Sequence, residues 1–100
     1  MHARIATFEA DPARADEAIA AARQQVESNW ANPPEGLETA KELYMLIDRE
    51  HGRGLGITLY ETEEDLQRGN EALNQMSPPA EAGQRRTDVA IYEVALHKQR

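Results

Sequence analysis

The three histidines come first in a search for chemistry, because imidazole binds metals and exchanges protons near neutral pH. His2 and His97 lie in the first and last predicted strands, which we expect to be antiparallel neighbours, so both would lie at one end of a sheet. Two imidazoles without a third histidine or a carboxylate make a weak metal site. His51 lies in a predicted turn. We therefore expect solvent-exposed histidines and no bound metal.

Glu93 is the one charged side chain within the apolar stretch 89–96. A buried carboxylate has a raised pKa and can act as a base. The alternative is an ion pair across the sheet or a subunit interface, for which strand pairing makes Arg4 the nearest candidate. We favour the ion pair.

The remaining common catalytic patterns are missing from the sequence. The chain has no cysteine, which excludes disulfides, thiolate nucleophiles and cysteine-bound metals. The glycine spacing of residues 52–56 superficially resembles a phosphate loop, but it leads into a predicted strand instead of a helix N-terminus. There is no Ser-His-Asp order and no paired-carboxylate spacing. We expect no cofactor.

The composition limits the possible partners. One hundred residues with a net charge of −7 predict a single acidic domain over 1–100, which repels nucleic acid and anionic membranes. No apolar run approaches the roughly 18 residues of a membrane span. The N-terminus lacks a signal-peptide pattern, so we expect a cytoplasmic protein. Leu, Ile, Val and Phe number only 17 against 16 alanines, so the core of one chain is thin.

The first half of the chain predicts a strand, a helix and a second strand. Residues 2–9 read as the strand, and Asp11 followed by Pro12 is typical of a helix start, because Asp caps free amides and Pro suits the first helical position. The helix over 12–30 has an apolar stripe at helical spacing, formed by Ile19, Ala22, Val26 and Trp30. Its many alanines favour close packing on a sheet. The apolar run 43–47 then predicts a strand within 41–49.

The second half repeats this order from a β-hairpin onward. Residues 54–61 form its second strand after a turn at 50–53, with Gly56, Thr58 and Tyr60 on one face. Thr62 begins a helix with acids in its first turn and a stripe of Leu66, Gly69, Leu73 and Met76. A polar loop over 77–86 precedes the last strand, predicted over 87–97. The β-α-β-β-α-β order predicts a ferredoxin-like α+β sandwich with an antiparallel four-stranded sheet.

The strand patterns also predict a partner. Two helices cover one face of a four-stranded sheet, and an exposed second face should alternate with polar residues. The stretches 43–47 and 89–96 are instead apolar at nearly every position. We therefore expect a homodimer that packs sheet face on sheet face, in preference to strands that simply expose apolar residues.

The sequence resembles one known family. The resemblance rests on the first strand ending in Ala-Thr-Phe-Glu, on the Asp-Pro helix start, and above all on the hairpin region from Leu46 to Leu66 with its glycine-rich strand. These features are similar to those of antibiotic-biosynthesis monooxygenase-like proteins. The resemblance covers nearly the whole chain and implies a dimeric α/β barrel. Members of this superfamily include cofactor-independent quinol or anthrone oxygenases, haem-degrading enzymes and small proteins without assigned activity.

The haem-degrading branch of this superfamily is characterised by an Asn on the first strand, a Trp ending the third strand and a His on the second helix. The matching positions here are Thr7, Tyr60 and no histidine within 63–76. These departures argue against haem degradation.

The resemblance implies a small cofactor-independent monooxygenase that acts on an aromatic, quinol- or anthrone-like substrate. Such a reaction needs an apolar pocket, hydrogen-bond donors and a base where one is required. We predict the pocket between helices and sheet, with Tyr60 and Thr7 as catalytic groups. The predicted substrate pocket consists of Trp30, Tyr44, Met45, Gly56, Thr58, Gly69, Met76 and Tyr92.

Two alternatives remain open. The same pocket could hold a small apolar molecule without catalysis, or side chains could fill it in a purely structural dimer. Both alternatives describe a non-catalytic dimeric α/β-barrel protein, one that binds a small molecule and one with a purely structural role.

Overall fold

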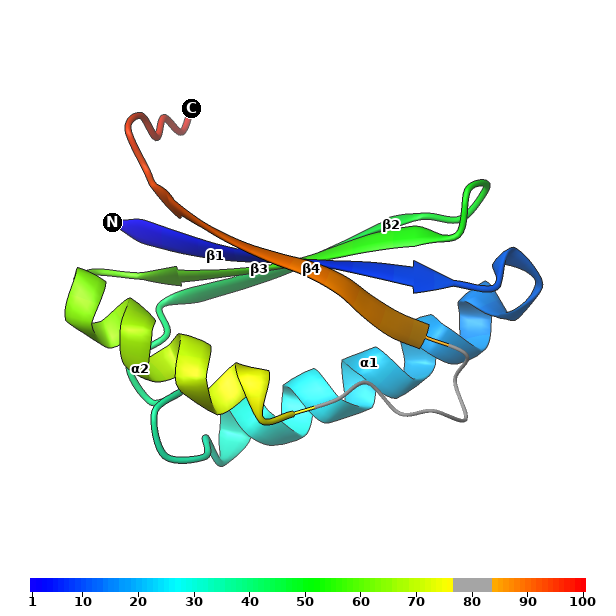
Figure 1. The fold of residues 1–100 in the computed structure, drawn as a ribbon, viewed down its shortest axis with the longest axis horizontal. Coiled ribbons are helices and arrows are strands. Elements are labelled where there is room, and N and C mark those ends of the chain that lie inside the picture. Colours follow the sequence, from blue (N-terminus) through cyan, green and yellow to red (C-terminus); the bar gives the residue numbers. More distant parts are fainter. Residues whose placement is uncertain (77–83) are drawn as a thin grey trace.

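The computed structural model describes residues 1–76 and 84–100, which form four strands, a short 3₁₀ turn and two α-helices (Figure 1). In chain order these are β1 (His2–Ala10), η1 (Pro12–Arg14), α1 (Ala15–Ala31), β2 (Glu42–Asp48), β3 (Arg53–Tyr60), α2 (Glu63–Asn74) and β4 (Gln84–Glu93). This order confirms the predicted β-α-β-β-α-β pattern.

The four strands form one antiparallel sheet in the order β2-β3-β1-β4. Both helices lie against the same face of this sheet, as Figure 1 shows, and no helix or strand of the described residues covers the opposite face. The arrangement confirms the ferredoxin-like α+β class. Among the described residues, no helix is long and apolar enough to cross a membrane.

The predicted helix starts are confirmed in their local chemistry. The Asp11 carboxylate accepts a hydrogen bond from the Ala13 amide at 2.9 Å, and Pro12 opens the 3₁₀ turn that leads into α1. The Thr62 hydroxyl accepts from the Asp65 amide at 3.1 Å, and three acidic residues occupy the first turn of α2.

The register assigns side chains to the two faces of the sheet. β1 pairs Arg4 with Thr58 and Ile5 with Ile57 of β3, and β2 pairs Met45 with Gly56. Because successive side chains alternate, Arg4, Thr58 and Met45 lie on the helix-covered face, and Ile57 lies on the open face. The buried apolar side chains are mostly small: Ala3, Ala6, Ala15, Ala18, Tyr60 and Leu66.

The last strand begins and ends earlier than predicted. β4 spans Gln84–Glu93, whereas the apolar pattern indicated 87–97. The register explains the shift, because Glu93 pairs with His2, the first residue of β1, and beyond it only the Val94 amide still donates to β1's end of the chain, to the Met1 carbonyl oxygen at 2.9 Å, among the described residues. At the other end Arg85 pairs with Glu9 and adds a surface ion pair. The rest of the predicted polar loop, 77–83, lies outside the described residues.

The open face of the sheet exposes several large apolar side chains. Tyr44 and Leu46 of β2 are 47% and 48% exposed, and Tyr92 of β4 is 56% exposed. Ile57, on the same face, is half-buried within the single chain.

Candidate functional site

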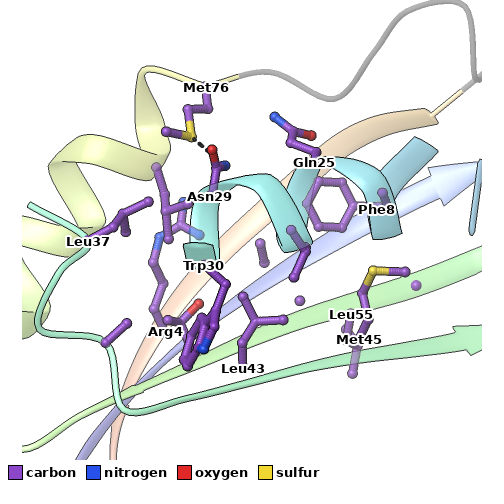
Figure 2. A pocket seen from close by; sticks show the side chains of 18 of the residues that line it. Arg4, Phe8, Gln25, Asn29, Trp30, Leu37, Leu43, Met45, Leu55 and Met76 are labelled. Carbon is purple, nitrogen blue, oxygen red and sulfur yellow. Dashed lines mark hydrogen bonds between the residues drawn. The ribbon is translucent and has the colours of Figure 1, made fainter. Parts of the chain in front are cut away.

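A cavity of about 380 Å³ lies between α1 and the helix-covered face of the sheet. α1 contributes Ala22, Val26 and Trp30 to its wall, and the sheet contributes apolar side chains, among them Phe8, Leu43 and Met45. Figure 2 shows Trp30, Leu43, Phe8 and Met45 around this space. The expectation of close helix–sheet packing at the alanines is therefore wrong at Ala22, where the small side chain borders open space.

Arg4 is a buried charged group of the cavity wall, with 3% of its surface exposed. Its Nε donates to the Asn70 side-chain oxygen at 2.8 Å, and its Nη2 donates to that of Asn74 at 3.0 Å. Burial and the neighbouring Arg86 lower the pKa of Arg4, and Tyr60 opposes this decrease. Arginine nevertheless stays protonated in proteins, so a positive charge lies in the wall.

Arg86 of β4, the strand beside β1, also lies in the cavity wall. It donates to the backbone oxygens of Leu73 at 3.0 Å, Met76 at 3.2 Å and Asn74 at 3.3 Å. These carbonyls lie at the C-terminal end of α2, where a cation is favourable. Since Asn74 accepts hydrogen bonds from both Arg4 and Arg86, the two guanidinium groups lie close together at the end of α2.

Glu38 supplies the carboxylate of the described cavity wall. Its oxygens accept from the Gly36 amide at 2.7 Å and from Arg68 at 2.6 Å. Its own backbone amide, the Gly36 amide and Arg68 hold the pKa of this carboxyl below its usual range. Glu38 is therefore ionised at neutral pH and is a weak base.

Five of the predicted pocket residues lie in the wall of the cavity: Trp30, Met45, Gly56, Thr58 and Met76. Gly56 leaves space there, because an added Cβ would lie 3.4 Å from the Phe8 ring. The Met76 sulfur accepts a long hydrogen bond of 3.9 Å from the side-chain amide nitrogen of Asn29, drawn in Figure 2. Thr58 is a buried hydroxyl on this wall.

The other predicted site residues lie outside this wall. The side chains of Arg4 and Ala6 on β1 face the cavity. Because successive side chains of a strand alternate, the Thr7 side chain lies on the open face of the sheet. Tyr44 and Tyr92 also lie on that face and are exposed. The catalytic role assigned to Thr7 stays a prediction, now for a group on the face away from the cavity.

Tyr60 and Gly69 form a separate contact beneath α2. Tyr60 is fully buried, and a Cβ at Gly69 would overlap its hydroxyl. Gly69 belongs to the predicted substrate pocket, but the Tyr60 ring occupies the space beside it. Burial raises the pKa of the Tyr60 phenol, opposed by Arg4 and Thr58. Its hydroxyl has no hydrogen-bond partner among the described residues. Its catalytic role also stays a prediction.

Glu93 and Arg4 do not form the expected ion pair. The register places Glu93 opposite His2 and Arg4 opposite Ile91, and the partners of Arg4 are asparagines of α2. His51 lies in the β2–β3 turn as predicted, where its ring contacts the Asp48 carboxylate at 2.8 Å. No cluster of three metal-ligating side chains occurs within residues 1–76 and 84–100.

Sequence reasoning missed the two arginines as pocket groups. Arg4 carries a signal that could have found it, because it is the charged residue between apolar neighbours of a central strand. Arg86 carried none, since it lies in a polar stretch that predicted a loop.

Two solved structures share this fold. One is a candidate antibiotic biosynthesis monooxygenase from Deinococcus radiodurans, with 13% identity, 99% of this chain and 97% of that chain covered, and a TM-score of 0.59. The second is an antibiotic biosynthesis monooxygenase with 17% identity, 97% and 100% coverage, and a TM-score of 0.56. No protein-family model and no curated protein matches the sequence. The chain therefore has the fold of antibiotic biosynthesis monooxygenase-like structures, as its sequence predicted.

Proposed function

We propose that this protein is a cofactor-independent monooxygenase for an aromatic substrate of the quinol or anthrone type. The observation that carries the proposal is the cavity of about 380 Å³, which combines an apolar wall with the buried cation of Arg4. A cavity of this volume is large enough for an aromatic ring beside apolar residues such as Trp30 and Phe8, and its polar side chains suit a ring oxygen. The shared fold with monooxygenase-like structures supports the same assignment.

The substrate supplies the electrons in this reaction. An anthrone-type ring loses two hydrogens from its methylene carbon, dioxygen adds one oxygen atom there as a carbonyl, and the second oxygen atom leaves with both hydrogens as water. The substrate is oxidised by four electrons and dioxygen is reduced by four, so the balance needs no external reductant.

The protein's part is to favour the ionised substrate. Arg4 and Arg86 place positive charge at the wall, which lowers the pKa of a bound phenol or enol. Thr58 can donate a hydrogen bond to the ionised oxygen from the same wall. The proton leaves to water, since the wall carboxylate, Glu38, is a weak base.

The lowered pKa of Glu38 also favours a second candidate function. A cavity without a raised-pKa carboxylate in its described wall suits a protein that binds an aromatic molecule without transforming it.

Oxygen uptake separates the two functions. Protein freed of metals with a chelator is mixed with anthrone, and we expect oxygen consumption above buffer with one anthraquinone formed per dioxygen. Saturable quenching of Trp30 fluorescence without product would favour the binding protein. A protein that neither consumes oxygen nor binds anthrone would contradict both functions.

We also propose that two copies pack through the open sheet face. The exposed Tyr44, Leu46 and Tyr92 lie on this face, and burying apolar surface is the main favourable term in association. A second copy brings the same apolar surface and buries both at once. This partner would supply the core that one chain lacks.

A further inference from the structure

The charge of the cavity wall differs from that of the whole chain. The protein carries a net charge of −7, yet Arg4 and Arg86 lie together in the wall. The carboxylate of the described wall, Glu38, is already paired with Arg68 at 2.6 Å. The space beside the two arginines is therefore positively charged.

These arginines differ from others in the chain by their partners. Arg14, Arg49, Arg53, Arg68 and Arg85 each form an ion pair with a carboxylate. Arg4 and Arg86 instead donate to neutral side-chain and backbone oxygens, and no carboxylate of residues 1–76 or 84–100 lies within ion-pair distance of either.

A buried charge without a counter-charge is unfavourable, since burial removes its hydration. Arg4 is almost completely buried, and its described hydrogen bonds occupy two of its five N–H donors. An anionic group entering the cavity would restore the missing charge balance.

We propose that Arg4 and Arg86 bind a carboxylate of the ligand, so that the protein selects aromatic acids over neutral aromatic compounds. A carboxylate presents two oxygens to guanidinium groups, while the apolar wall around Trp30 holds the ring. This inference deepens the proposed function and rests on it for the cavity as the ligand site.

The test compares naphthalene-2-carboxylate with naphthalene-2-carboxamide, which has nearly the same shape but no charge. Neither compound has the hydroquinone or methylene hydrogens that the proposed oxidation removes, so binding is measured without turnover. By calorimetry at neutral pH we expect the acid to bind at least about tenfold more tightly, as for a hydrogen-bonded charge.

Two variants assign this preference to the arginines. Arg86→Gln and Arg4→Gln should each reduce the preference for the acid severalfold while the carboxamide affinity stays near its original value. Unchanged carboxamide binding shows that the cavity is intact, which separates charge recognition from a structural role. Arg85→Gln is the matched control, since Arg85 is exposed and paired with Glu9. If the buried Arg4→Gln variant fails to fold, Arg86→Gln alone tests whether the arginines cause the preference for the acid.

Equal affinities for acid and amide would overturn the proposal, as would a preference for the acid that is undiminished in Arg86→Gln. Failure of both compounds to bind would also overturn it. Anthrone has no carboxylate, so oxygen uptake with anthrone tests the proposed oxidation independently of this selectivity.

Discussion

The Tyr60 hydroxyl lies directly against Gly69, so that α2 can pack on β3 only because position 69 has no side chain. A Cβ built there would overlap Oη and lie 2.6 Å from Cε1 of the ring. Tyr60 is fully buried, so the ring has no free space into which it could move.

Gly69→Ala should therefore reduce the free energy of unfolding by about 1–2 kcal/mol, because overpacking outweighs the gain in helix propensity. Urea denaturation followed by circular dichroism measures this change. Tyr60→Phe removes the overlapping atom and a hydroxyl without a described partner, so we expect it to be nearly neutral alone and to restore part of the loss in Gly69→Ala. Strictly additive effects would contradict the contact.

The two threonines proposed for chemistry lie on opposite faces of the sheet, which gives a matched pair of variants. Thr58→Val removes a hydroxyl from the cavity wall and should lower kcat/KM for anthrone oxidation about two- to tenfold, the value of one hydrogen bond. Thr7→Val changes the open face and should leave kcat/KM unchanged. Equal losses, or a loss in Thr7→Val alone, would support the catalytic role first assigned to Thr7.

The sequence allowed the fold to be predicted because its local signals agreed with one another. Capping residues at Asp11 and Thr62 marked helix starts, and the alternation in 54–61 placed Gly56 and Thr58 on the correct common face. Which side chains of β1 lie on the helix-covered face could not be predicted in the same way. Its small residues Ala3 and Ala6 are both buried although they lie on opposite faces, so the apolar pattern does not distinguish them.

The composition of the site was harder to predict for a physical reason. A buried arginine is rare and needs partners, and those of Arg4 come from α2, more than sixty residues away. The position of Arg86 depends on β4 beginning at Gln84 through backbone pairing with Ala10, which no apolar pattern indicates. Tyr60 was a chemically plausible catalytic group. Its ring instead lies under α2, in the gap that Gly69 leaves by having no side chain.

The proposed dimer predicts that a charge on the open sheet face separates the subunits. Light scattering should give about twice the chain mass of 11.2 kDa for the unmodified protein. Ile57→Glu places a carboxylate in the centre of the proposed interface, where removing its hydration is costly, and should reduce the mass to that of one chain. Leu96→Glu, in the exposed segment after β4, controls for added charge. A monomeric unmodified protein at micromolar concentration would contradict the dimer.

The Glu38 carboxyl links stability to pH. Its own amide, the Gly36 amide and Arg68 lower its pKa in the folded protein, so the folded state binds this proton less readily than the unfolded state. The resulting stabilisation is present above the unfolded-state pKa of about 4.3 and is lost as pH falls through the lower folded-state pKa. Glu38→Gln should make the loss of stability below about pH 5 less steep in thermal unfolding. Glu35→Gln controls for removing one charge from the same loop, and an identical slope in both variants would contradict this assignment.

Filling the cavity tests whether the space beneath α1 is open. Ala22 lies on the inner face of α1, so Ala22→Leu should occupy the cavity and weaken naphthalene-2-carboxylate binding at least about tenfold. Because the leucine enters open space, the free energy of unfolding should stay equal or increase, whereas insertion into a packed core costs about 1–3 kcal/mol. Ala20→Leu, on the exposed face of the same helix, should change neither quantity appreciably. Destabilisation by Ala22→Leu with unchanged binding would show instead that side chains already fill this space, and would favour the structural dimer.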